Sequence, residues 1–472
     1  MGIYLNPSAD GFASIMKTGD YVDKTGLITY MNAVLNSSRN MLCSSRPRRF
    51  GKSYAAQMLS AFYSKGADAG ELFAHLRVAN PPEETKEKEK EWYNKYRNNC
   101  DVLFWDMAWF ISNAQNIEDT ILNLQRDIGK ELREAFPDCV TEEVVSLPEI
   151  LLTISVKTGH KFLIIIDEWD ALFREAPENT ELQKTYIQLL RALFKGIQVS
   201  RFLCGAYMTG ILPIKKYGTH SALNMFDEFT MLDPGPLAEY VGFTEQEVEE
   251  LCGRYQMDLA EIKNWYDGYS FPGESSVYSP RSVVNAMRFR KIGNYWNQTE
   301  TFEALQWYID LNFDGLRDDV LQMMAGKKIP VNTGSFTNDM TTFRTEDDVL
   351  TLLIHLGYLG YEEQNKYVFI PNAEVQSEYA SAVTVSQWGD ISKALKNSAD
   401  ILNAIWQRRP EQVAEGIRQA HFETSHIQYN DENALSYTIS LALYAARNFY
   451  TVHCELAGGK GFADMVLSLI HI

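Results

Sequence analysis

The chain has 472 residues and carries 44 Lys and Arg residues against 62 Asp and Glu residues, which gives a formal net charge of −18 at pH 7. Its hydrophobic fraction of 45% and aromatic fraction of 12% exclude a disordered chain and predict a folded protein of about two to four domains. The acidic balance argues against broad, non-specific binding of nucleic acid, but it leaves room for a local basic site.

Cysteine spacing and apolar runs indicate the compartment. The cysteines are scattered and form no C-x-x-C pair, which is typical of reduced thiols in a cytoplasmic protein. The first residues show no basic region followed by an apolar run, so no secretory signal is expected. The longest apolar run, residues 162–166, is far too short to cross a membrane. We therefore expect a cytoplasmic protein without a membrane partner.

The first predicted domain spans residues 1–240, and its residues 40–240 alternate between apolar runs and amphipathic segments. This alternation predicts a mostly parallel sheet that is covered by helices on both faces. A charged segment at 81–99 is expected to be a solvated helical insertion. The five predicted strands span residues 40–45, 100–110, 160–168, 201–210 and 228–233.

Beyond residue 240 the pattern becomes helical. Thr244 followed by Glu247 is a capping box, which predicts a helix start. Residues 347–383 predict a helix, a turn, two short strands and a second helix, an order that resembles a winged-helix module. We therefore predict a helical and winged-helix region over 241–383 and a third domain over 384–472.

A basic stretch at residues 44–59, SSRPRRFGKSYAAQML, joins the first strand to a predicted helix. Gly51, Lys52 and Ser53 at the junction of strand, loop and helix favour a phosphate-binding loop. Backbone N–H groups at the helix start would point at an anion, and Lys52 would reach the β- and γ-phosphates of ATP. The Ser53 hydroxyl would bind Mg²⁺.

The loop departs from the usual G-x-x-x-x-G-K-[ST] pattern. Arg46 stands where a glycine is usual, and Pro47 removes a backbone donor. The loop would exchange these backbone contacts for the positive charges of Arg46, Arg48 and Arg49. The alternative reading of the loop is a basic surface turn.

A second motif, FLIIIDEWDAL, is a buried strand that ends in two carboxylates. Asp167 suits Mg²⁺, and Glu168 suits a general base that polarises the attacking water. The strand at 100–110 lies between the two motifs in sequence, and P-loop folds with this base have an extra strand between the motif strands. The alternative is a strand that simply ends in acidic loop residues.

Thr209 stands at the end of the next apolar strand. In this architecture it would lie between the two motif strands, near the γ-phosphate, where it could orient water. The alternative is an ordinary capping threonine. An arginine in cis or in trans would help phosphoryl transfer, and the sequence does not rank the candidates Arg174, Arg191 and Arg201.

Several of these segments resemble the bacterial AAA-ATPase-like proteins that carry a C-terminal nuclease-like domain of the PD-(D/E)XK type. The segments are YVDKTGLI (21–28), RPRRFGKS (46–53), IIIDEWDAL (164–172), MTGILPI (208–214), WYDGYSF (265–271) and VYSPRSVVNA (277–286). The resemblance implies an α/β fold with a P-loop NTPase sheet of the AAA/ASCE type, and it makes the glycine-poor loop normal. It implies ATP and Mg²⁺ as ligands.

The residues expected at the nucleotide extend beyond the Gly-Lys-Ser junction. Phe50 and Tyr54 flank that junction and complete the nucleotide-binding set with the loop arginines. Asp23 and Lys24 lie upstream of the first strand, where such folds often contact the base or ribose. The alternative for this pair is a structural N-terminal turn.

The same resemblance implies a partial α/β nuclease-like domain at the C-terminal end. Glu432 resembles the early helical glutamate of that fold, and Asp464 in GFADMVL resembles its metal-binding aspartate. The E-x-K half should follow on the next strand, where the sequence stops, so nuclease chemistry by this chain is not expected.

The last six residues, LSLIHI, allow a further hypothesis about the gene. One codon choice for them reproduces the transposon end used in preparing sequencing libraries, so the native protein would continue beyond them. A native stop codon after Ile472 would refute this.

Together these observations predict an ATP-binding protein, most simply a Mg²⁺-dependent ATPase whose hydrolysis drives a conformational change relayed through the helical region. One alternative is a nucleotide-gated binding module without turnover. Another is a DNA nuclease that the ATPase regulates in a longer form, which would contact nucleic acid through the C-terminal region. A homo-oligomer is also compatible with the sequence.

Overall fold

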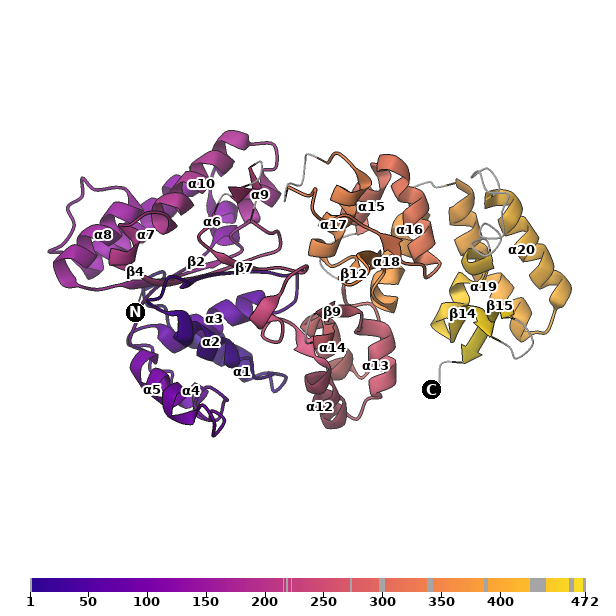
Figure 1. The fold of residues 1–472 in the computed structure, drawn as a ribbon, viewed down its shortest axis with the longest axis horizontal. Helices are drawn as coiled ribbons and strands as arrows, with labels where there is room; N and C mark the ends of the chain where they lie inside the picture. Colours follow the sequence, from indigo (N-terminus) through magenta and orange to yellow (C-terminus); the bar gives the residue numbers. More distant parts are fainter. Residues whose placement is uncertain are drawn as a thin grey trace.

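The computed structural model presents the chain as three parts arranged along its long axis, with the N-terminal α/β part at one end (Figure 1). The helical middle part and a small C-terminal part follow in chain order. The structure describes residues 2–214, 216–217, 220–221, 223–271, 274–296, 302–337, 343–385, 389–424, 439–457 and 462–469.

A five-stranded parallel sheet forms the centre of the first part. Its strands run in the spatial order β2-β3-β4-β1-β7, which confirms the expected parallel sheet. The strands are β1 (Met41–Ser45), β2 (Asp101–Asp106), β3 (Phe162–Asp167), β4 (Leu203–Gly210) and β7 (Asp227–Phe229). Two further short strands, β5 (Lys216–Tyr217) and β6 (His220–Ser221), form a separate hairpin.

All five strands are shorter than their predicted ranges, as β2, β4 and β7 show. The predicted strand at 100–110 ends at Asp106, because that side chain caps helix α6 (Met107–Asn113) by accepting a hydrogen bond of 2.8 Å from the Ala108 amide. Helix α11 (Val199–Phe202) takes up the start of the predicted fourth strand, and β7 keeps only three residues.

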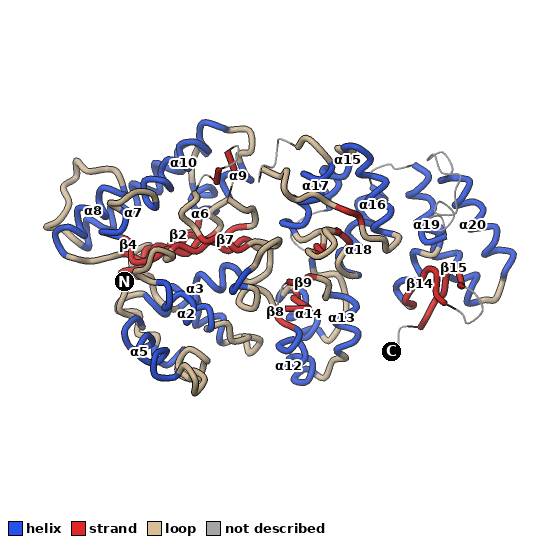
Figure 2. Tube along the Cα trace, in the orientation of Figure 1, coloured by secondary structure: helices blue, strands red, loops and turns tan. Residues whose placement is uncertain are grey.

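Helices cover both faces of the sheet, so β3 is buried along its whole length (Figures 1 and 2). Because side chains alternate along a strand, Ile164 and Ile166 of β3 join one apolar cluster, while Leu163 and Ile165 join the other. The first face carries α6, α7 (Thr120–Ala135), α8 (Leu147–Thr158), α9 (Ala171–Glu175) and α10 (Thr180–Phe194), and the second carries α1 (Asp10–Met16), α2 (Gly26–Val34), α3 (Lys52–Tyr63), α4 (Gly70–Phe73) and α5 (Lys86–Tyr96). Short 3-10 turns η1 (Ile117–Asp119) and η2 (Gly235–Leu237) complete this part.

The charged insertion at 81–99 forms α5, which lies beside α2 at the outer edge of the first part. It buries Glu89 and Tyr93 and leaves most of its other residues exposed to solvent. The expectation of a solvated helix is therefore confirmed.

The middle part begins at the predicted capping box. The Thr244 side chain accepts a hydrogen bond from the Glu247 amide, and the Glu247 side chain accepts one from the Thr244 amide, as expected. This half contains α12 (Glu245–Tyr255), α13 (Leu259–Tyr266) and α14 (Pro280–Phe289) beside a sheet of order β8-β10-β9, with β8 (Phe243–Thr244), β9 (Tyr269–Phe271) and β10 (Glu274–Tyr278).

The second half of the middle part has the predicted order of helix, two strands and helix. The structure adds a third strand, because β11 (Ile329–Pro330) pairs with β13 in a sheet of order β11-β13-β12. The elements are α15 (Phe302–Asp310), η4 (Phe313–Gly315), α16 (Leu316–Met324), α17 (Glu346–Leu356), β12 (Gly360–Glu362), β13 (Tyr367–Phe369) and α18 (Ala373–Val385).

The C-terminal part is a helical pair with an antiparallel hairpin. Its elements are α19 (Gly389–Trp406), α20 (Pro410–Thr424), η5 (Tyr444–Asn448), β14 (Tyr450–Ala457) and β15 (Phe462–Leu469). Within the described residues, no helix combines the length and apolarity that a bilayer crossing requires.

Candidate phosphate-binding site

The basic stretch connects β1 to α3 at the carboxyl end of the sheet. Gly51 precedes the helix with φ of 88°, a left-handed conformation that glycine adopts without strain, and Arg49 has φ of 70°. The Ala55 amide donates to the Gly51 carbonyl over 3.0 Å. The amides that precede Ala55 therefore lie in the first turn of α3, where helical N–H groups are available to an anion.

Lys52 lies across its own loop. Its Nζ donates to the Pro47 carbonyl over 2.8 Å, and the residue is 7% exposed. Burial lowers the Lys52 pKa to about 8, although the carboxylates of Asp170, Asp167 and Glu168 act in the opposite direction. The lysine and the acidic end of β3 are therefore close enough to interact, as the two sequence motifs predict.

Asp167 is the point where the two motifs meet. Its Oδ1 accepts hydrogen bonds from the Thr209 hydroxyl and, over 3.1 Å, from the Glu168 amide. Burial raises the Asp167 pKa, and hydrogen bonds from Thr209 and Ser53 act against that rise. The hydroxyls of α3 and β4 thus converge on the carboxylate at the end of β3.

Strand order explains why Thr209 reaches this point. β4 lies between β1 and β3 in the sheet, and Thr209 is in register with Ser44 of β1. The strand that separates the two motif strands in space is therefore β4, whereas the predicted strand 100–110, which separates them in sequence, forms β2 at the edge of the sheet.

Glu168 extends from the same strand end with φ of 49° and is the more open carboxylate. Its Oε2 accepts from Arg174 Nη2 over 2.8 Å, and the exposed fraction of its side chain is 36%. Arg174 Nε also lies 3.4 Å from Asp170 Oδ2. The sequence predicts Glu168 as a base, and the structure adds a cationic partner for it.

Two acidic residues near the site were missed by the sequence reasoning. Asp170 is fully buried and accepts from the amides of Ile211 and Leu212 over 3.0 and 2.8 Å. Asp106 ends β2 in register with Asp167, and burial raises its pKa to about 6. A signal for Asp170 existed in the sequence, since it is the second aspartate of the DEWD run.

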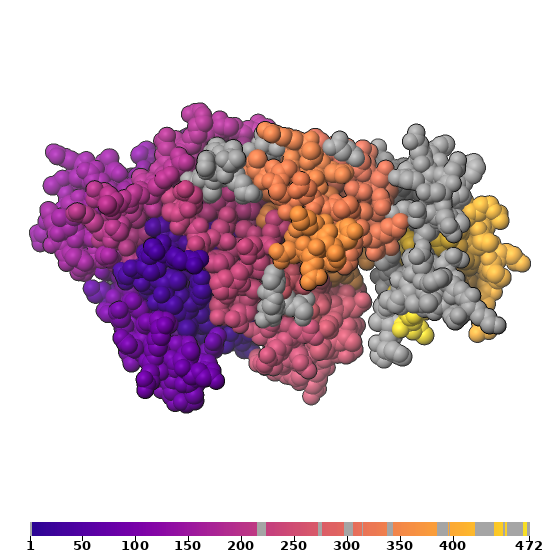
Figure 3. Space-filling model, in the orientation of Figure 1, coloured from indigo at the N-terminus to yellow at the C-terminus, as the bar shows by residue number. Residues whose placement is uncertain are grey.

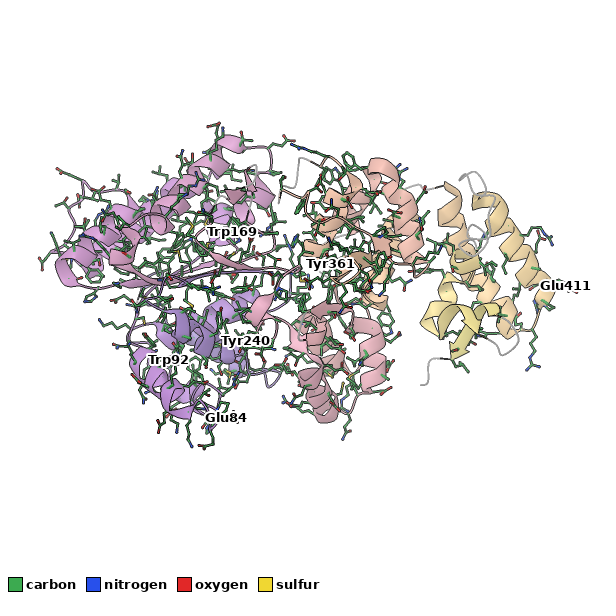
Figure 4. All side chains as sticks on the ribbon, in the orientation of Figure 1. Glu84, Trp92, Trp169, Tyr240, Tyr361 and Glu411 are labelled. Carbon is green, nitrogen blue, oxygen red and sulfur yellow. The ribbon has the colours of Figure 1, made fainter. Side chains whose placement is uncertain are left out.

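Close packing fixes the turn that follows β3. A Cβ on Gly210 would lie 2.5 Å from Trp169 Nε1 and 2.9 Å from Asp170 Oδ1, so only glycine fits there. Trp169 is labelled in Figure 4, and its amide donates to the Thr209 carbonyl over 2.8 Å. The ends of β3 and β4 are therefore held together as one rigid edge.

The remaining loop residues have partners in the middle part of the chain. Arg46 is fully buried, donates to the Thr230 carbonyl over 2.7 Å and lies over the Phe271 ring at 4.9 Å; burial lowers its pKa to about 10. Arg49 Nη1 donates to the Tyr295 carbonyl over 3.2 Å. Instead of facing only the expected anion, these arginines attach the loop to the neighbouring region.

Phe50 continues this attachment. It is fully buried in the apolar cluster of the middle part, and its ring meets Tyr269 edge to face at 5.4 Å. Arg48 is half-buried, and Tyr54 in the first turn of α3 is 58% exposed.

Asp23 and Lys24 both have structural partners. Asp23 Oδ1 accepts from the Thr25 amide and hydroxyl, and its Oδ2 accepts from the Arg77 amide. Lys24 Nζ forms an ion pair of 2.5 Å with Glu247. These contacts correspond to the structural alternative for this pair, an ordered N-terminal turn.

The residues assigned to a nuclease-like metal site are only partly placed. Asp464 lies on β15 of the C-terminal hairpin, while Glu432 lies outside the described residues. Among the residues that the structure describes, no three His, Cys, Asp or Glu side chains gather into a group that could hold a metal ion.

A comparison with protein families matches the part of the chain that contains this site. A family model described as predicted AAA-ATPase matches residues 8–219, a range that includes Lys52, Asp167, Glu168 and Thr209. The match does not extend to the middle or C-terminal parts.

Similar proteins cover part of the chain. An uncharacterized protein from the vnfD 5′ region of Azotobacter chroococcum mcd 1 is 27% identical over 302 residues, which is 61% of this chain and 53% of that protein. The chain therefore spans about half the length of the curated relative that it matches. Among solved structures, a Walker-type ATPase of Pyrococcus abyssi is 14% identical with a TM-score of 0.34, covering 72% of this chain and 91% of that one.

Proposed function

We propose that this protein is a Mg²⁺-dependent ATPase of the P-loop type. The observation that carries the proposal is the convergence of Lys52 and Ser53, at the start of α3, on Asp167 and Thr209 at the carboxyl end of the sheet. A helix start with a lysine favours a triphosphate, and the facing carboxylate favours the cation that accompanies it. The family-model match over residues 8–219 supports the same class.

The donor set fits Mg²⁺. The Ser53 hydroxyl and the Asp167 carboxylate are hard oxygen ligands, and Ser53 lies close enough to Asp167 to act on the pKa of that carboxyl. When bound, the ion would neutralise phosphate charge. Lys52 would leave the Pro47 carbonyl to contact the phosphates, and the first-turn amides of α3 would hold them.

Hydrolysis needs a base, and Glu168 is the candidate because its carboxylate is the more open one at this edge. A water oxygen would bond to the γ-phosphorus while the bond from that phosphorus to the bridging oxygen of ADP breaks. Glu168 would accept the proton that the water loses. Thr209 would keep Asp167 oriented from β4.

The phosphate loop is also the contact between the first and middle parts. Arg46, Arg49 and Phe50 all reach residues beyond 240, so a loop that rearranges around phosphate would shift these contacts directly. We propose that turnover changes the position of the middle part by this route.

The Arg174–Glu168 ion pair supports a second candidate, a module that binds ATP without turnover. A carboxylate held at 2.8 Å by a guanidinium has less capacity to accept a proton from water. If this pair persists in the ATP complex, nucleotide would act only as a ligand that sets the conformation.

The test measures ATP binding by calorimetry and phosphate release with Mg²⁺ present. Lys52→Ala should weaken binding by about tenfold or more, while Glu168→Gln should retain binding and lose turnover by about a hundredfold or more. Lys90→Ala removes the same charge from the exposed face of α5 and should match the wild type. Equal ATP affinity of Lys52→Ala and wild type would overturn the site, and binding without turnover in the wild type would favour the second candidate.

A further inference from the structure

Arg174 is a buried cation at the end of the sheet that holds two carboxylates. Its side chain is 7% exposed, with Nη2 2.8 Å from Glu168 Oε2 and Nε 3.4 Å from Asp170 Oδ2. Burial acts to lower the Arg174 pKa, but Asp170 and Glu168 outweigh it and raise the pKa. The guanidinium therefore keeps its charge inside the protein.

The structure separates this arginine from the other two candidates. Arg191 on α10 and Arg201 on α11 are exposed, whereas Arg174 lies directly at the acidic end of β3. Arg174 is therefore in direct contact with Glu168, the residue proposed as the base. Position thus ranks three arginines that the sequence leaves equal.

The two carboxylates bound by Arg174 differ in how firmly they are held. Asp170 is fully buried and committed to the amides of Ile211 and Leu212. Glu168 is about one-third exposed and follows a left-handed residue conformation at the strand end. Asp170 is therefore the fixed anchor of Arg174, and Glu168 is the partner that can be exchanged.

We propose that Arg174 is a positioning residue that holds Glu168 in an ion pair when no nucleotide is bound and exchanges it for the terminal phosphate of ATP. This inference rests on the proposed ATP site. A guanidinium binds phosphate oxygens in the same fork geometry that it uses for a carboxylate, and a terminal phosphate carries more negative charge. The exchange frees Glu168 at the moment when its water substrate is in place.

Exchange makes a specific prediction about energetic coupling. If Glu168 and ATP compete for Arg174, then Glu168→Gln weakens the contact between residue 168 and Arg174. ATP should then bind about three- to tenfold more tightly. In an Arg174→Met background there is nothing left to compete for, so the same Glu168→Gln change should alter ATP affinity by less than twofold. A purely structural Arg174 would give two independent effects.

The experiment is a double-mutant cycle on ATP affinity, measured by calorimetry with Mg²⁺ on the full chain and accompanied by thermal unfolding of every variant. Arg174→Lys provides a second cycle in case Arg174→Met does not fold, because lysine keeps a positive charge beside Asp170 without the planar fork. In that cycle the effect of Glu168→Gln should shrink by at least about threefold relative to the wild-type background.

The outcomes separate this inference from the proposed function. Wild-type protein that does not bind ATP would remove the proposed function. Wild-type protein that binds ATP, with equal effects of Glu168→Gln in the presence and absence of Arg174, would overturn the exchange and leave the ATP site intact. Reduced coupling in either arginine background supports the exchange.

Discussion

A single hydroxyl at Thr209 connects the two halves of the candidate site. It donates to Asp167 from the strand between β1 and β3, and it is completely buried. An unpaired buried carboxylate oxygen is costly, so this contact contributes to the stability of the site as well as to its orientation. Thr209 therefore has a structural role and a functional role. One substitution can test both, if stability and ATP turnover are measured on the same variant.

Thr209→Val keeps the branched shape and removes the donor. We expect the free energy of unfolding to fall by about 1–3 kcal/mol because Asp167 loses a buried hydrogen bond. ATP turnover should fall by about tenfold or more while ATP affinity changes by less than about threefold. Urea denaturation and phosphate-release kinetics check these values. Thr209→Ser is the matched control that retains the hydroxyl, and unchanged turnover in Thr209→Val would remove Thr209 from the mechanism.

Glu374 of α18 is a second buried residue that contacts the segment beneath the phosphate loop. It is 1% exposed, and its Oε1 accepts from the amides of Tyr295 and Trp296 over 2.7 and 3.0 Å. Burial raises its pKa to about 7, and the neighbouring Glu378 adds to the rise. Tyr295 in turn receives Arg49 from the phosphate loop. This carboxyl thus supports the segment on which the loop rests.

The pH dependence of stability follows from that shift. Between its ordinary value of 4.5 and about 7, the folded state holds a proton at Glu374 that the unfolded state has released. The free energy of unfolding should therefore fall as pH rises through this window, by up to about 3 kcal/mol from this group. Glu374→Gln keeps a hydrogen-bond acceptor and removes the charge. The free energy of unfolding of this variant should therefore lack the decrease that Glu374 causes as pH rises. Tyr266 and Tyr269 also interact electrostatically with this carboxyl, and their raised pKa values keep both hydroxyls neutral in this range.

Urea denaturation at a series of pH values from 5 to 8 compares the free energies of unfolding of the wild type and Glu374→Gln. Glu411→Gln is the control, because Glu411 is exposed on α20 at the far end of the molecule, as Figure 4 shows. It should leave the pH profile of the wild type unchanged. Parallel profiles for wild type and Glu374→Gln would contradict the assignment.

At the scale of elements, the phosphate loop is packed from outside by a turn about 300 residues away. Gly357 ends α17 with φ of 85°, and a Cβ there would lie 2.8 Å from Pro47 Cβ and 2.9 Å from the Trp296 ring. Pro47 is the residue whose carbonyl receives Lys52. The helix end and the loop therefore share one tightly packed contact.

Gly357→Ala should displace the loop as well as strain the turn. We expect ATP affinity to fall by about threefold or more, because the added methyl group pushes on Pro47. Gly66→Ala is the matched control: Gly66 has φ of 80° and nothing within 4 Å of its Cβ position, so it reports the backbone strain alone. Calorimetric titration with ATP compares the two. Equal losses of affinity would show that contact with the loop does not matter.

The sequence predicts those elements that local patterns determine. The apolar runs predict all five strands of the main sheet, and the Thr244–Glu247 spacing predicts the start of α12. The Gly-Lys-Ser junction and the DE pair bring Lys52, Ser53, Asp167 and Glu168 to one edge for the same reason, since each follows a parallel strand.

What the sequence leaves out depends on contacts between distant residues. The end of β2 at Asp106 and the extra strand β11 require partners that no local pattern reveals. Arg49 meets Tyr295, and Phe50 meets Tyr269, more than 200 residues away in sequence. For that reason the sequence alone suggests a phosphate ligand or a basic surface turn for the loop arginines, and it does not reveal their contacts with the middle part.

At the scale of the whole molecule, the apolar cluster of the middle part crosses the predicted domain boundary at residue 240. It contains Phe50 and Leu212 from the first part together with residues from α15 to α18. In the space-filling view, the surface of the pink residues near 250 directly adjoins that of the α/β part (Figure 3). The first two parts therefore share a core, so we expect ligand binding at the loop to act on both.

Hydrogen exchange should show this connection. ATP with Mg²⁺ should slow amide exchange not only in the loop 46–51 but also at Tyr295 and Trp296, by about threefold or more, because a loop fixed by phosphate stabilises the segment that holds Arg49. Exchange in α20, which belongs to the C-terminal part, should remain unchanged. In Lys52→Ala, the amides of residues 295 and 296 should exchange at the same rate with and without ATP and Mg²⁺. Protection that stops at the loop in wild-type protein would mean that the shared core does not transmit binding, and relay through the middle part would then be wrong.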